Sequence, residues 1–162
     1  RFRWDMRHSG AWDKDKKRAY RNGPLAAPEK YTIVLQIGKE QLRQSFELMA
    51  DPRILEEGVK YEDMKKQETL ALQIVDLHSR AKKEADKVEK KIKKMKGDSN
   101  EKTALKKLKD AFVQSKGRYT QPKLLSQIGY LYGVVNRADQ IPGRDTFKRY
   151  DELIRELSKL VD

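Results

Sequence analysis

The feature that most constrains this chain is a change in hydrophobic period after Gly58. From Met64 onward, apolar residues recur every three or four positions, and a heptad register that begins there continues through Ile92 and Met95. A period near 3.5 residues keeps one side of a helix against a partner, whereas the side chains of a strand alternate between two faces. The sequence therefore predicts one long helix over residues 61–96 that packs on other helices along its length.

Shorter helical patterns follow the long one. The spacing of apolar residues predicts a helix over residues 101–115, a second that begins at Thr120 and Pro122, and a last one, after Gly143, whose stripe runs from Phe147 to Val161. Helix-breaking residues separate these segments, namely Gly97, Gly117, Pro142 and Gly143. The helical half is therefore expected to be an antiparallel bundle of three helices with a fourth, shorter segment.

The first third of the chain carries β patterns instead. Residues 1–7 alternate apolar and polar side chains as a half-buried strand does, and residues 8–29 have the glycines and prolines of a loop. Residues 31–37 are rich in β-branched side chains, and a Gly38-Lys39 turn leads into a second strand over residues 40–49.

Three strands do not close a sandwich, and an isolated hairpin is marginal in water. We therefore predict an α+β fold in which an incomplete antiparallel sheet of about three strands, within residues 1–53, precedes a helical bundle of three to four helices over residues 54–162. The chain opens at Arg1 already in strand-like sequence, so we expect further strands upstream or on a complementing chain.

Composition excludes several classes of chemistry. The 162 residues contain no cysteine, which removes thiolate nucleophiles, disulfides and Cys-based metal sites. Apolar stretches run only a few residues, so no membrane span is expected. No phosphate-binding glycine loop, zinc-protease motif or serine elbow occurs. We expect no cofactor, no metal and no catalysis within this chain.

The individual histidines and acids favour structural roles. His78 occupies a heptad position of the long helix, which predicts a partly buried histidine in the helix interface, while His8 lies far away in sequence. Asp5 and Asp51 are the acids nearest to apolar neighbours, but each adjoins a strand end or a turn, where aspartate caps backbone N–H groups.

The net charge of +12 favours a polyanionic partner, but much of it lies in residues 82–96, where acids alternate with lysines. Interleaved acids blunt the field beyond the screening length of about 8 Å in physiological salt. A solvated helix face laced with ion pairs is therefore favoured, and nucleic acid is not the expected partner. The alternative is a polyanion contact through Lys87, Lys90, Lys91 and Lys94.

Aromatic residues give one further hypothesis. Trp4, Trp12, Tyr20 and Tyr31 gather near the first loop, where exposed rings could stack on sugars. Core packing is favoured for Trp4 and Tyr31. Trp12, surrounded by polar residues, is the candidate glycan contact.

Several short motifs resemble one kind of protein. They are Phe2-Arg-Trp-Asp-Met-Arg7, Gly10-x-Trp12, Gly23-Pro-Leu-Ala-Ala-Pro28, Tyr31-Thr-Ile-Val-Leu35 and Asp51-Pro-Arg53. In order and spacing they are similar to the C-terminal region of large bacterial β-propeller proteins of the sialidase-like, sortilin-like type, whose repeats (BNR repeats) earn them the label "glycosyl hydrolase". Glu29 departs from the pattern, because that family usually has glycine there.

The resemblance implies the end of an Ig-like or fibronectin-like β module followed by a helical tail. It implies structural roles for Trp4, Asp5, Arg7, Gly23, Pro24, Pro28, Tyr31, Asp51, Pro52 and Arg53. Any hydrolase activity would lie in a propeller outside this chain. The resemblance also implies export to the periplasm, cell surface or medium. The expected partners are that propeller part or a complementing chain, with self-association through the helices as another possibility.

Overall fold

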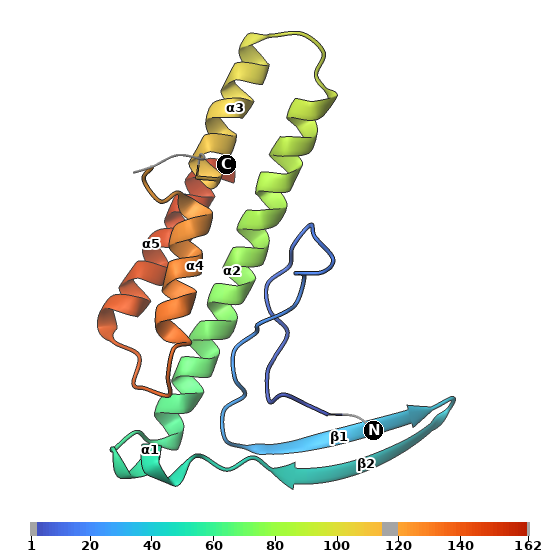
Figure 1. The fold of residues 1–162 in the computed structure, drawn as a ribbon, viewed down its shortest axis with the longest axis vertical. Helices are drawn as coiled ribbons and strands as arrows, with labels where there is room; N and C mark the ends of the chain where they lie inside the picture. The colour runs from blue at the N-terminus through green and yellow to red at the C-terminus, as the bar shows by residue number, and fades with distance from the viewer. Residues whose placement is uncertain (1–2, 115–119, 162) are drawn as a thin grey trace.

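A computed structural model describes residues 3–114 and 120–161 and shows an α+β fold. A two-stranded antiparallel sheet of β1 (Lys30–Ile37) and β2 (Glu40–Glu47) precedes the helices. These are α1 (Pro52–Glu56), α2 (Tyr61–Lys94), α3 (Asn100–Phe112), α4 (Leu124–Val135) and α5 (Arg144–Val161). Figure 1 shows the hairpin at one end of α2 and α3 at the other, with α4 and α5 beside the first half of α2.

The long helix α2 packs against α3, α4 and α5. The heptad pattern predicts such a helix over residues 61–96, and α2 spans Tyr61–Lys94. It has 34 residues and is about 51 Å long at a rise of about 1.5 Å per residue. Leu70, Ile74 and Leu77 are fully buried on its inner side. They pack in one core with Phe112 of α3, Ile128 of α4 and Leu153 of α5. The stripe on α2 is therefore covered by three different helices.

The ends of the shorter helices differ from the prediction. α4 begins at Leu124, so Pro122 precedes the helix instead of standing in its first turn. The helix α1, which the period does not predict, starts at Pro52 because Asp51 caps it by accepting the N–H of Arg53. Ser99 caps α3 through the N–H of Lys102. The predicted break at Gly117 lies outside the described residues.

The hairpin forms around the predicted Gly38-Lys39 turn, and β2 ends at Glu47 instead of residue 49. The strand predicted over residues 1–7 does not form within residues 3–7. Trp4 donates its indole N–H to the carbonyl of Arg7, and Asp5 accepts the N–H of Arg7. These local bonds occupy backbone groups that a strand would pair, and Met6 has a φ of 58°. A single bridge joins Arg7 to Leu25. The Ig-like sandwich remains a prediction.

Residues 6–11 and 20–26 run antiparallel in an irregular ladder over α2. Backbone hydrogen bonds join His8 to Pro24 at 2.9 Å and Gly10 to Tyr20 at 2.9 Å. The two segments cross so closely that a Cβ added to Gly23 would lie 1.9 Å from the carbonyl oxygen of His8. Gly23 is therefore required by close backbone approach, which explains its place in the Gly-Pro motif.

We predict that Gly23→Ala destabilises the chain by about 3 kcal/mol or more, because a Cβ there overlaps backbone atoms that cannot move aside cheaply. The matched control is Gly133→Ala in α4, where a Cβ meets no atom within 4 Å. This control should gain about 0.5–1 kcal/mol from helix propensity. Urea unfolding followed by circular dichroism measures both, and equal stability of the two variants would contradict the crossing.

Candidate functional site

The most unusual surface is one face of the β1–β2 hairpin. The register places Tyr31, Ile33, Leu35 and Ile37 of β1 on the same face as Leu42 and Phe46 of β2. Ile33, Leu35, Ile37 and Leu42 are 53%, 52%, 64% and 65% exposed, respectively. Exposed apolar clusters occur at contact sites for proteins, membranes or ligands. We call these four residues the apolar hairpin face.

An aromatic cluster anchors the base of the hairpin. The ring of Trp4 lies 5.4 Å from that of Tyr31 and 6.0 Å from that of Phe46, measured between centroids. Tyr31 also donates its hydroxyl to the carbonyl of Ala27 at 2.7 Å. The base of the hairpin is thus fixed by packing, while the residues nearer to the Gly38 turn project away from the bundle (Figure 1).

Glu68 of α2 joins the N-terminal segment to the bundle. Its buried carboxylate accepts hydrogen bonds from the His8 ring at 2.7 Å and from the N–H of Ala27 at 2.9 Å, and it pairs with Lys65 at 2.9 Å. Burial opposes ionisation, but the hydrogen bonds from Lys65, Ala27 and His8 outweigh it and lower the pKa of Glu68. Residue spacing does not predict this role, because Glu68 lies at the margin of the apolar stripe and its partners His8 and Ala27 are far away in the sequence.

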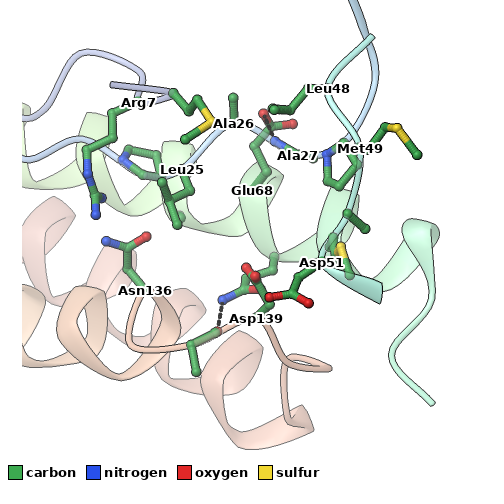
Figure 2. A pocket seen from close by; sticks show the side chains of 18 of the residues that line it. Arg7, Leu25, Ala26, Ala27, Leu48, Met49, Asp51, Glu68, Asn136 and Asp139 are labelled. Carbon is green, nitrogen blue, oxygen red and sulfur yellow. Dashed lines mark hydrogen bonds between the residues drawn. The ribbon is translucent and has the colours of Figure 1, made fainter. Parts of the chain in front are cut away.

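Figure 2 shows a hollow beside Glu68, with a volume of about 290 Å³. It is lined by the first loop, the β2–α1 connection, α2 and the segment after α4. Three acids line it, and two of them, Glu68 and Asp51, form hydrogen bonds or ion pairs. Asp51 binds Arg53 at 2.6 Å, and this side-chain bond holds the pKa of Asp51 at about 2. Both carboxylates are therefore engaged as acceptors, so neither is poised as a proton donor at neutral pH.

A second buried polar side chain, Gln67 of α2, lines the same hollow as Glu68. Gln67 donates to the carbonyls of Val135 and Ala138 at 2.5 and 2.6 Å, and its own oxygen accepts the N–H of Gln140. It thus satisfies backbone groups at the end of α4. The residues around the hollow hold segments together, and this arrangement supports a structural role.

The motif residues of the sequence lie in this same region. Arg7 donates to the carbonyl of Gly23 at 2.9 Å, Pro24 is fully buried, and Pro28 is half-buried. Asp5 and Asp51 both accept backbone N–H groups, as the turn-capping hypothesis expects. The motif residues Trp4, Arg7, Gly23 and Tyr31 therefore lie in the N-terminal segment and at the base of the hairpin. Pro52 and Arg53 lie in α1.

Trp12 lies elsewhere, over the middle of α2. It is half-buried, and its backbone N–H donates to the hydroxyl of Ser79 at 2.9 Å. With Ala85 and Leu125 it lines a hollow of about 220 Å³. Packing against the bundle accounts for this position, and the glycan contact remains a hypothesis.

The candidate polyanion lysines gather at the far end of α2. Lys87 binds Glu84 at 2.6 Å and Lys90 binds Asp86 at 2.7 Å, in agreement with a face of interleaved ion pairs. Among the described residues, Lys91 and Lys94 make no ion pair. All four lysines line one hollow with apolar residues of α3 and α5, a feature that the spacing of α2 alone does not reveal.

Comparisons with protein-family models, with curated proteins and with solved structures find no match to this chain. The resemblance to propeller proteins therefore rests on the sequence motifs. Within residues 3–114 and 120–161, no helix is both long and apolar enough to cross a membrane. The same residues contain no group of three or more His, Cys, Asp or Glu side chains placed to hold a metal ion.

We predict that Glu68→Gln costs about 1–3 kcal/mol at pH 7, because the charge-assisted bonds to Lys65 and His8 are lost. The pKa of Glu68 is lower in the folded protein, so its stabilisation is present above the ordinary value of 4.5 and is lost as the pH falls through the lower folded value. The difference between wild type and variant should shrink below pH 4.5. Asp76→Asn, at an exposed acid on α2, is the control and should change stability by less than about 0.5 kcal/mol.

His78 gives a separate pH dependence. Burial, helped by the nearby charge of Lys82, lowers the pKa of His78 from 6.5 to about 4. Between these values the unfolded chain binds a proton that the folded protein does not, so stability falls as the pH drops from 6.5 to 4. We predict that His78→Gln flattens this part of the curve in urea unfolding. An unchanged slope would show that His78 is not buried in its neutral form.

Proposed function

We propose that this chain is a non-catalytic structural and interaction module of an exported β-propeller protein, and that the apolar hairpin face docks on another β element of that protein. The observation that carries the proposal is the exposure of four large apolar side chains on one face of a two-stranded sheet. A hairpin of two strands is marginal on its own and is stabilised when further strands or a second layer cover its apolar face.

The chemistry of the hairpin favours a β partner. Its alternation of apolar and polar side chains is that of a strand with one face in a core, and both strands are edges within the described residues. Trp4 holds the N-terminal segment against Tyr31 and Phe46. A β module joined to the same polypeptide through that segment would lie within reach of the apolar face.

A second copy of this chain is a weaker candidate for the same face. The net charge of +12 makes two copies repel each other, and no complementary acidic surface is contributed by the hairpin, whose charged residues carry both signs. The motif resemblance implies a β module of the propeller protein, and such a module would cover the apolar hairpin face without repulsion between two copies of this chain.

The test places a photo-crosslinking benzoylphenylalanine at Leu35 in the full-length product of the gene. The matched control places it at Gln36, the next residue of β1, which points to the opposite face. We expect Leu35 to crosslink to a β-rich segment outside residues 1–162, and Gln36 to give much less of that product. Crosslinks from Leu35 solely to residues 1–162, to a second copy, or to nothing would contradict the proposal.

A second measurement separates docking from folding. Leu35→Thr/Leu42→Thr keeps β propensity and removes apolar area from side chains that are already half exposed. In the chain alone it should change the free energy of unfolding by no more than about 1 kcal/mol. In the full-length protein it should abolish the protection of the hairpin from proteolysis. A large loss of stability in the chain alone would show that the face is packed within this chain.

A further inference from the structure

The α2–α3 end of the bundle carries a groove with an apolar floor and a basic rim. The floor is formed by Val88 of α2, by Leu105, Leu108 and Phe112 of α3, and by Leu160 and Val161 at the end of α5. The rim carries Lys87, Lys90, Lys91 and Lys94, with Glu84 as the acid in the lining. We call this hollow of about 380 Å³ the lysine-rimmed groove.

The groove marks the place where the core of the bundle reaches the surface. Phe112 is fully buried in the main core, and Leu108 and Leu160 pack against that core from its edge. α4 and α5 cover the first half of α2, whereas Figure 1 shows the last turns of α2 paired with α3 beyond the end of α5. Within residues 3–114 and 120–161, α2 and α3 are the helices at this end, and two helices alone do not enclose a core.

The lysines of the rim favour an occupant with negative charge. Lys87 and Lys90 are held by acids of their own helix, but Lys91 and Lys94 make no ion pair among the described residues. A lysine keeps its charged end in water while its carbon chain covers apolar surface, so these side chains border the floor and present ammonium groups above it. An occupant with acids beside an apolar stripe would match both parts of the groove.

We propose that the lysine-rimmed groove binds an acidic amphipathic helix of a partner protein. Leu105 and Leu108 of α3 are half-buried and lie three residues apart on one side of the helix, which is the spacing on which an apolar stripe of another helix packs. A second copy of this chain would bring the same lysines and be repelled. A nucleic acid would use the lysines but would gain nothing from six apolar residues beneath them.

The test measures binding of designed peptides to the whole chain by fluorescence anisotropy. The probe is a labelled helical peptide with leucines on one face and glutamates flanking them. One control peptide carries lysine at every glutamate, and the other is a polyglutamate of equal charge. We expect saturable binding of the acidic amphipathic probe, weakened by added salt, and at least about tenfold weaker binding of both controls.

Chain variants locate the contact. Lys91→Glu/Lys94→Glu should weaken binding of the probe about tenfold, because two rim contacts become repulsive. Lys16→Glu/Lys107→Glu makes the same change of charge at exposed lysines that do not line the groove, and it should change binding by less than about twofold. Leu105→Asn, at a half-buried floor position, should weaken binding without loss of helical circular dichroism.

Three results would overturn the proposal. The first is no saturable binding up to the solubility limit of the peptide. The second is equal binding of polyglutamate and the amphipathic probe, which would make the site a general polyanion surface. The third is an equal effect of the two lysine double variants, which would show that net charge, and not the groove, governs binding. The outcome is independent of the apolar hairpin face, which lies at the other end of α2 (Figure 1).

Discussion

Burial of the apolar stripe of α2 is the interaction on which the rest of the structure depends. Leu70, Ile74 and Leu77 are at most 1% exposed, and they pack in one core with side chains of α3, α4 and α5. Removing one such leucine would cost about 2–5 kcal/mol, a large part of the stability of a small domain. α3, α4 and α5 are therefore held in place chiefly by α2.

The N-terminal segment depends on the same helix in a different way. It contributes few large apolar side chains to the main core, and it is fixed by polar contacts at intervals along α2. These contacts run from Glu68 through Ser79 and Lys82 to Glu89, which bind His8, Trp12, Asp13 and Lys14 respectively. The buried bonds of Glu68 contribute more than the exposed pair of Lys14 and Glu89, which water screens. The segment is thus tethered most firmly next to the hairpin.

Both ends of α2 leave apolar surface open. At its N-terminal end the tethered segment positions a hairpin whose outer half has nothing to pack on within the described residues. At its C-terminal end α2 and α3 extend past α5 and leave the lysine-rimmed groove. A chain with 38% charged and 37% hydrophobic residues covers one helix well but has little apolar surface left to enclose both ends. We therefore propose two separate contacts for this open apolar surface, one with a β element at the hairpin and one with a helix at the groove.

Much of this architecture could be predicted from residue patterns, and the exceptions have clear causes. The stripe from Met64 to Met95 predicts α2 because its period is maintained over many turns. The alternation in residues 1–7 predicts a strand, but within residues 3–7 local hydrogen bonds of Trp4 and Asp5 with Arg7 override it. The role of Glu68 and the groove depend on which distant segments meet, and local spacing carries no information about that.

Native-state hydrogen exchange of the chain alone tests whether α2 is the most stable element of the fold and whether the hairpin is only marginally stable without a partner. The amides of α2 between Leu70 and Ala85 should exchange slowest, through global unfolding. The amides that pair β1 with β2 near the Gly38 turn should exchange through local opening, several kcal/mol below the global value. If the hairpin amides exchange as slowly as those of α2, the hairpin is stable by itself and does not depend on a partner.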